Sequence, residues 1–396
     1  MAVDSSETKV TAQIDLSNNL LSIEDLDLYF SDLNGSLNFS NEAGLYAENL
    51  NAKLFNRQIK GSARTDNLGG SRFLLLEAGG SVKSDDVYEW TGQPLLYNTS
   101  GYLNYDLNLY VPLEKKDGDL KIEFFSDLVG LKSYLPQPFD KSESSVKKNF
   151  TYKKILSGSE VVTNLIFGDS FRAKLKYEEG AIVGGQVLLN DGSQTLNADR
   201  PLEIKGTLSK LDIDSWLSIL SDLPKIGTSE DVFDHDIKFG GASIKAENLI
   251  AGGISFGDTQ IGVTRNLDSW TSFFRNERLI GELELWDKKS KPIAIHLDRL
   301  ILDSNPSENM IFKRDDKPSL SSTYSFSSDL IRISGKDYKD VSFEYSKSNY
   351  ESKFNKLSAT FGSLTIDNAI VSWSSGMGKQ TSTFKGDFEI SNLMET

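Results

Sequence analysis

The run GYLNYDLNLYV, residues 101–111, decides the fold class of this chain. Apolar and polar side chains alternate in it at every step, which is the pattern of a β-strand with one buried face and one wet face. Pro112 follows directly and removes the backbone donor that a longer ladder would need. One face of this strand carries Leu103, Tyr105, Leu107, Leu109 and Val111. The stretch therefore predicts an antiparallel strand with a single apolar face.

The same alternation recurs further along the chain. Asp117-Gly118 is a strong hairpin signal between alternating runs, and a strand with Leu120, Ile122 and Phe124 on one face follows it. Further alternating sets are Phe171, Ala173, Leu175 and Tyr177; Leu283 and Leu285; and Ile293, Ile295 and Leu297. The pattern predicts a succession of antiparallel hairpins whose strands are each apolar on one face.

Helical periodicity is concentrated in residues 213–223, where Asp212 or Asp214 could cap the first turn. A short repeat also occurs, AENLNA at residues 47–52 and AENLIA at residues 246–251. A repeat within a chain of hairpins suggests an elongated array rather than a closed globule.

These patterns predict a mainly β chain of antiparallel hairpins with one or two short helices. We divide it into approximate units at residues 1–88, 89–200, 201–263 and 264–396.

Composition argues against several classes of function. The chain has 396 residues and a formal net charge of −14, so it lacks the positive field that nucleic acid needs. It has no cysteine, which excludes disulfides, thiolate zinc sites and thiol nucleophiles. It has two histidines. His296 alternates with apolar residues, which places it on the polar face of a strand. His235 lies in the acidic run 231–236, whose residues do not follow the order of ligands in a calcium-binding loop. We expect no catalytic residue, no metal and no cofactor.

The sequence contains no apolar run near the roughly 18 residues of a spanning helix. Its first residues have neither the basic nor the apolar part of a signal peptide. We therefore expect a segment of a longer, anchored protein.

The alternating apolar faces leave two arrangements open. Two sheets packed face to face would bury them, as in a structural or adhesive interaction protein. One long curved sheet would instead keep a continuous apolar trough, which suits acyl chains while charged residues stay on the outside.

Four blocks carry a resemblance to a known family. They are EWTGQPL at 89–95, SDLVGLKSYLPQPFDK at 126–141, LDIDSWL at 211–217 and KPIAIHLDRL at 291–300. The second block is the specific one, and the order of all four also matches. The chain resembles the YhdP-type central region of the AsmA-like superfamily of Gram-negative envelope proteins.

The resemblance implies a periplasmic β-groove, built from an elongated, twisted and curved antiparallel sheet. It also implies that a helix outside this chain anchors the protein to the inner membrane. It implies a non-enzymatic phospholipid conduit between the inner and outer membranes, with acyl chains in the groove and membrane components reached through parts missing from this chain. It favours the trough over the face-to-face sheets. The candidate groove residues are Leu103, Tyr105, Leu107, Leu109, Val111, Leu120, Ile122, Phe124, Phe171, Leu175, Leu283, Leu285, Ile293, Ile295 and Leu297.

Overall fold

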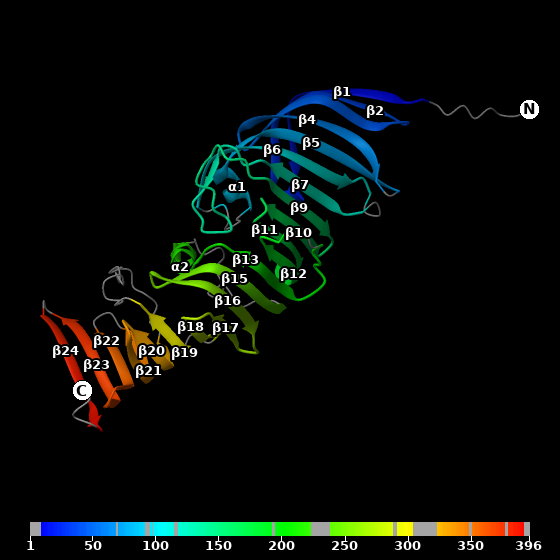
Figure 1. Cartoon of the computed structure of the whole chain (residues 1–396). Helices are drawn as coiled ribbons and strands as arrows, with labels where there is room; N and C mark the ends of the chain where they lie inside the picture. Colours follow the sequence, from blue (N-terminus) through cyan, green and yellow to red (C-terminus); the bar gives the residue numbers. More distant parts are fainter. Residues whose placement is uncertain are drawn as a thin grey trace, which may run out of the picture. The chain divides into compact units, whose positions relative to one another are not determined.

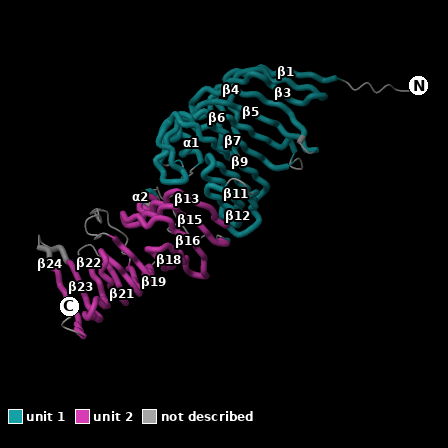
Figure 2. The backbone as a smooth tube through the Cα atoms, viewed as in Figure 1, with its two compact units in different colours: residues 1–202, 218–238 teal, residues 203–217, 239–396 magenta. Residues whose placement is uncertain are grey.

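The structure is a computed structural model that describes residues 9–68, 70–91, 96, 98–114, 118–191, 195–222, 238–287, 291–303, 323–347, 351–376 and 379–391. The acidic run 231–236 lies outside these residues. The chain divides into two compact units (Figure 2). Unit 1 comprises residues 1–202 and 218–238, and unit 2 comprises residues 203–217 and 239–396.

Unit 1 is a sheet of consecutive strands with one α-helix beside it (Figure 1). Its elements are β1 (Thr11–Ile23), the 3₁₀ turn η1 (Glu24–Leu26), β2 (Leu28–Ser40), β3 (Gly44–Leu54), β4 (Arg57–Leu68), β5 (Ser71–Lys83), α1 (Ser84–Thr91), β6 (Thr99–Pro112), β7 (Leu120–Ser126), β8 (Leu131–Ser133), β9 (Phe150–Ser157), β10 (Glu160–Phe167), β11 (Phe171–Glu178) and β12 (Ala181–Leu189).

The ladder of unit 1 runs almost in sequence order. Every strand from β1 to β12 pairs antiparallel with the next, except that the short β8 pairs with β6 and β7 pairs with β9. Leu107 lies opposite Phe124 in the β6–β7 pair, so the predicted apolar faces of these strands coincide. Unit 1 is thus one continuous sheet and not two sheets packed face to face.

Unit 2 continues the hairpin pattern but contains two parallel pairs. Its elements are β13 (Leu202–Leu208), β14 (Leu211–Asp212), α2 (Ile213–Asp222), β15 (Phe239–Ala251), β16 (Ile254–Arg265), β17 (Ser269–Arg275), β18 (Leu279–Trp286), β19 (Ile293–Leu302), β20 (Tyr324–Ile333), β21 (Lys336–Lys347), β22 (Glu351–Phe361), β23 (Leu364–Gly376) and β24 (Lys379–Ile390). Strand β14 is parallel to β15, and β19 is parallel to β20. The consecutive pairs from β15 to β19 and from β20 to β24 are antiparallel.

The helix α2 begins where the sequence predicts it. The Oδ1 atom of Asp212 accepts a hydrogen bond of 3.0 Å from the backbone N of Ser215, so Asp212 is the residue that caps the helix. The Asp214 carboxylate instead accepts the backbone N–H groups of Gly252 and Gly253, at 2.9 Å and 2.7 Å. These bonds fasten the start of α2 to the turn between β15 and β16.

Residues with positive φ interrupt the long strands and shift their register. Asn49 in β3 has a φ of 57°, and the register with β4 shifts between Ala47 and Leu50. In β15 the register shifts in the same way between Ala246 and Leu249. Such bulges bend a strand and increase its twist. The AENL repeat of the sequence is therefore a bulge element.

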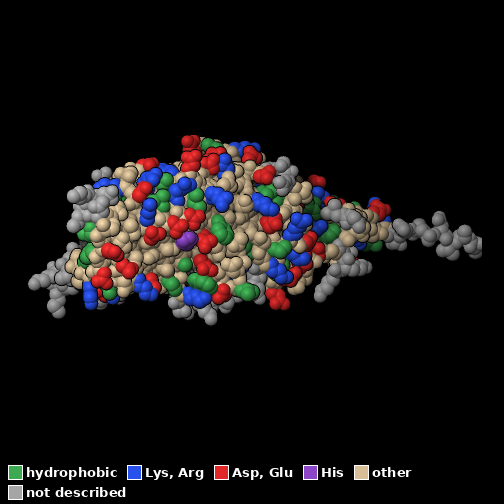
Figure 3. Space-filling model, turned by 60° about the horizontal axis from the view of Figure 1, so that its bottom comes forward, with side chains coloured by type: hydrophobic (Ala, Val, Ile, Leu, Met, Phe, Trp, Pro, Cys, Tyr) green, Lys and Arg blue, Asp and Glu red, His purple; other side chains and the backbone are tan. Residues whose placement is uncertain are grey.

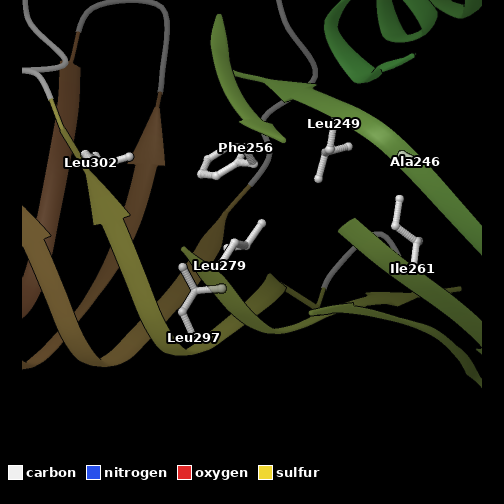
Figure 4. Packing of buried hydrophobic residues seen from close by; sticks show 7 residues of the cluster. All are labelled: Ala246, Leu249, Phe256, Ile261, Leu279, Leu297 and Leu302. Carbon is white, nitrogen blue, oxygen red and sulfur yellow. The ribbon is translucent and has the colours of Figure 1, made fainter. Parts of the chain in front are cut away.

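The core of unit 2 lies on one side of its sheet, where the side chains of Phe256, Leu279 and Leu297 lie close together (Figure 4). Ala246, Leu249, Ile261 and Leu302 complete this cluster. Each fully buried aliphatic or aromatic side chain of this kind contributes about 1.5–3 kcal/mol.

The predicted fold class, a mainly β chain of antiparallel hairpins with one or two short helices, is confirmed. The parallel pairs were not expected, and the division into four units stays a prediction. Neither helix of the described residues combines the length and apolar character that crossing a membrane requires.

Candidate functional site

One face of the unit 1 sheet is apolar from β4 to β12, and we call it the groove face. Its positions follow from the register, because residues directly opposite one another in a ladder point to the same side. One row across the sheet consists of Gly61, Ala78, Leu107, Phe124, Tyr152, Leu165, Ala173 and Val187. Hence eight neighbouring strands present a continuous, uncharged row to one side.

A cavity of about 440 Å³ lies on the groove face, between the sheet and a roof. This volume is in the range of about 300–1,000 Å³ that is typical of ligand pockets. The sheet contributes Leu103, Ile122, Phe124, Phe150, Tyr152, Lys154, Val161, Thr163, Leu165, Phe167, Phe171, Ala173, Leu175 and Tyr177. The roof contributes Val87, Trp90, Thr91, Leu96, Leu128, Leu131, Ser133 and Phe139, which belong to α1, the chain that follows it and the segment 127–148.

The helix α1 forms one part of the roof. Asp85 and Asp86 stand in its first turn, where negative charge favours a helix N-terminus. Trp90 donates a hydrogen bond of 2.8 Å from Nε1 to the backbone O of Leu26, and its ring lies 5.7 Å from that of Phe55. The helix is therefore held against the start of the sheet, with Trp90 also in the cavity wall.

The cap segment, residues 127–148, forms the other part of the roof. Its ends are tied by hydrogen bonds from the backbone N of Gly130 to Ser144 O, 2.8 Å, and from that of Lys148 to Asp127 O, 2.9 Å. The buried Lys141 is enclosed by the segment, and burial lowers the pKa of its ammonium group. These bonds give the cap segment a fixed shape, although its only strand among the described residues is the short β8.

Phe139 joins the cap segment to the sheet. Its ring centroid lies 5.7 Å from that of Phe167 and 4.7 Å from that of Phe171, both in the cavity wall. The hydroxyl of Ser170 donates to the backbone O of Pro138 at 3.0 Å, next to this contact. Aromatic contacts of this kind add about 0.5–1.5 kcal/mol beyond burial.

Two glycines allow the cap segment to approach β6. Gly101 has a φ of 109° and Gly130 a φ of 99°, a region that favours glycine. A Cβ atom on Gly101 would collide with the backbone O of Gly130, and one on Gly130 with the backbone O of Tyr102. Both positions therefore require glycine for the β6–β8 pairing.

The cavity has a low-dielectric interior. Burial raises the pKa of the Tyr152 hydroxyl to about 12 and also raises the pKa of Tyr177. Burial lowers the pKa of the Lys154 ammonium group, which is half-buried in the same wall. Desolvation, which disfavours the charged form of each group, is the largest cause of all three pKa shifts.

The opposite face of the same strands is wet and charged. Lys153 pairs with Glu123 at 2.7 Å and Lys176 with Glu160 at 2.8 Å, and Arg64 pairs with Glu77. Acidic and basic side chains are likewise interspersed over the face of the molecule that Figure 3 presents. Exposed pairs of this kind add little stability, but they keep their face of the sheet hydrated.

The structure distributes the fifteen predicted groove residues over several environments. Leu103, Ile122, Phe124, Phe171 and Leu175 line the cavity. Leu107 and Leu109 line a smaller space of about 50 Å³ nearer the start of unit 1. Tyr105, Val111 and Leu120 occupy groove-face positions of β6 and β7. Leu283, Leu285, Ile293, Ile295 and Leu297 belong to unit 2, where the first four are at least partly exposed and Leu297 is buried in the core. A lipid role for all fifteen stays a prediction.

The sequence reading missed the middle of the cavity, which β9 and β10 supply. In β9 the alternation of Phe150, Tyr152 and Leu156 is interrupted by Lys154. In β10 apolar residues stand on both faces, so no alternation is visible. The sequence contained one indication of the roof residues in the cap segment. Leu128, Leu131 and Phe139 lie within the block at 126–141, which is the specific part of the family resemblance.

One group in unit 2 has the residue types of a metal site. The donor atoms of His296, Asp298 and Asp329 lie within 4.8 Å of one another. All three residues are exposed, and His296 Nδ1 already lies 2.9 Å from the Ser327 hydroxyl. We assign no function to this group.

The family model of the YhdP protein matches residues 2–396, nearly the whole chain. This chain belongs to the YhdP protein family. No curated protein and no solved structure matches it. The block at 126–141 supplies four of the eight roof residues, namely Leu128, Leu131, Ser133 and Phe139.

Proposed function

We propose that this chain is a non-enzymatic segment of a phospholipid conduit, in which acyl chains lie against the groove face of unit 1. The observation that carries the proposal is the roofed apolar cavity on a continuous apolar face. Its lining contains apolar and aromatic side chains with few polar groups, the composition of a site for hydrocarbon.

The physical basis is the hydrophobic effect. Each CH₂ group that leaves water contributes about 0.8 kcal/mol, so an acyl chain binds well without a directional contact. Along the row from Ala78 to Val187 every position is uncharged, so a chain meets a similar environment at each strand. Similar environments imply small barriers between them, which is what a conduit requires.

The location of this conduit is part of the proposal. Membership of the YhdP family supports a place in the periplasm, between the inner and outer membranes. The anchor in the inner membrane and the contacts with components of both membranes then belong to parts of the protein outside this chain.

Two adjacent phenylalanines test the proposal. Phe124 lines the cavity, whereas Phe125 points to the opposite face, where the Lys153 ammonium lies 5.3 Å from its ring centroid. Each is replaced in turn with the photoreactive p-benzoylphenylalanine, and the protein is irradiated in Gram-negative cells. We expect mass spectrometry to find phospholipid cross-linked at position 124 and not at position 125.

Equal cross-linking at both positions, or none at position 124, contradicts the proposal. The alternative is a structural or adhesive protein whose apolar faces are closed on each other. If that alternative holds, native mass spectrometry of the protein purified without detergent will find no bound phospholipid.

A further inference from the structure

Lys154 is the one charged side chain at a groove-face position of β6, β7 and β9–β12 in the described ladder. Its direct neighbours across the sheet are Ile122 on β7 and Thr163 on β10. All three line the cavity. A single cation is thus set into an otherwise uncharged wall of mostly apolar and aromatic side chains.

The adjacent lysine is in a different environment. Lys153 points to the wet face and forms an ion pair of 2.7 Å with Glu123. Lys154 has neither an ion pair nor a hydrogen bond to any described residue, and desolvation is what lowers its pKa. Lys154 is therefore a half-buried cation with no counter-charge among the described residues.

Two hydroxyl groups belong to the same wall as Lys154. Thr163 is its partner in the ladder, and Tyr152 stands two residues away on the same face of β9. These two hydroxyls are hydrogen-bonded to each other, whereas the lysine ammonium has three donors of its own. The wall thus offers one positive charge beside a hydroxyl pair in a hydrocarbon site.

We propose that Lys154 binds the phosphate group of a phospholipid whose acyl chains occupy the cavity. The proposal rests on the proposed function and adds to it a fixed point where the head group is recognised. A lipid with a phosphate gains a charge-assisted hydrogen bond at this point, whereas a lipid without one leaves the ammonium unpaired. The cavity then selects phospholipids over neutral lipids with the same acyl chains.

The first test compares two lipids with identical acyl chains, pyrene-labelled phosphatidylglycerol and pyrene-labelled diacylglycerol, on the full chain. We expect Lys154→Met to weaken binding of phosphatidylglycerol about tenfold, which is the loss of one charge-assisted hydrogen bond. Binding of diacylglycerol stays the same or improves. Lys153→Met changes neither lipid, and Lys154→Arg retains binding of phosphatidylglycerol because it keeps the charge.

The second test uses the unmodified protein. Lysines are acetylated briefly at neutral pH, and the extent at each lysine is read from peptide masses. We expect phosphatidylglycerol to protect Lys154 and to leave Lys153 unprotected. Inorganic phosphate at the same concentration does not protect Lys154, because it lacks the acyl chains that hold the lipid in the cavity.

The outcomes separate this proposal from the proposed function. If both lipids bind and Lys154→Met weakens them equally or not at all, Lys154 is not a phosphate site and the conduit proposal stands. If inorganic phosphate protects Lys154 as well as phosphatidylglycerol does, the site takes a free anion and the lipid assignment is wrong. If the unmodified protein binds neither lipid, both proposals fail.

Discussion

The Nζ atom of Lys141 donates a hydrogen bond of 2.8 Å to the backbone O of Leu131, ten residues earlier in the cap segment. The same ammonium donates to the backbone O atoms of Glu143, 2.9 Å, and Ser144, 3.3 Å. One side chain therefore satisfies three carbonyl groups in a segment that has little regular secondary structure. The roof of the cavity depends on this lysine.

Replacement of Lys141 with methionine should loosen the roof. The buried backbone O of Leu131 loses the Lys141 donor, and Glu143 O and Ser144 O each lose a partly buried bond, although Ser144 O keeps the Gly130 N–H. We expect the free energy of unfolding to fall by about 2 kcal/mol. Hydrogen exchange at Gly130 and Lys148 should accelerate. Urea unfolding and exchange mass spectrometry measure the two effects. The exposed Lys147 provides the control, and a similar loss in Lys147→Met would refute this role for Lys141.

Tyrosines of the groove face should make the protein sensitive to alkali. Burial raises the pKa of Tyr105 and of Tyr152 to about 12, from the ordinary tyrosine value of 10.0. Between these pH values the folded state keeps protons that the unfolded state has lost, so the free energy of unfolding falls as pH rises through this window. Below it the contribution is fully present. Tyrosinate absorbance, recorded with urea unfolding at each pH, measures this loss.

Tyr105 allows a sharper version of that measurement. Its hydroxyl is buried and has no hydrogen-bond partner among the described residues. We expect Tyr105→Phe to raise the free energy of unfolding at neutral pH by about 1 kcal/mol, because an unpaired polar group is removed. The alkaline loss should also become smaller. Tyr102→Phe, at an exposed position of the same strand, should change neither quantity.

Gly130 should tolerate no side chain. Gly130→Ala introduces both a disfavoured φ and a collision with the backbone O of Tyr102. Gly158 also has a positive φ, 59°, but a Cβ atom there meets open space. We expect Gly158→Ala to cost about 1 kcal/mol, the conformational term alone, and Gly130→Ala to cost clearly more. Equal losses in urea unfolding would show that the collision is absent.

Filling the cavity should separate stability from lipid binding. Ala173 lines the cavity at the centre of β11 and is 2 % exposed. Ala173→Phe places a ring in the empty volume, so we expect the lipid-free protein to gain about 1 kcal/mol, as in other cavity-filling substitutions. Co-purified phospholipid, measured by native mass spectrometry, should decrease. Lys174→Phe puts the same ring on the wet face, and unchanged lipid is expected there.

Strict alternation made the strands around β6 and β7 predictable. A period of two residues states directly which side chains share a face, and Pro112 marks the end of the first strand. Asp117 of the predicted Asp117-Gly118 turn lies outside the described residues. Asp212 and Asp214 were both reasonable caps for α2, but only the fold shows that the Asp214 carboxylate is taken by the turn at Gly252.

The cavity itself could not be derived from local pattern. Its roof depends on contacts between distant residues, such as Phe139 with Phe171, and on the enclosed Lys141. Its wall includes Lys154, which is polar where the alternation of β9 requires an apolar residue. A break in a pattern is a natural signature of a functional position, because function places residues that folding alone would not.

The positive-φ bulges have a consequence for how the sheet is assembled. Strands of 13 residues with a simple alternating pattern could slide past one another by two positions and still keep their apolar faces aligned. The bulge at Asn49 fixes the register of β3 against β4. It interrupts the ladder between Ala47 and Leu50, and a shifted strand would place that interruption opposite the wrong residues of β4. The bulges thus specify the strand register and disfavour shifted, aggregation-prone pairings that would compete with the native sheet.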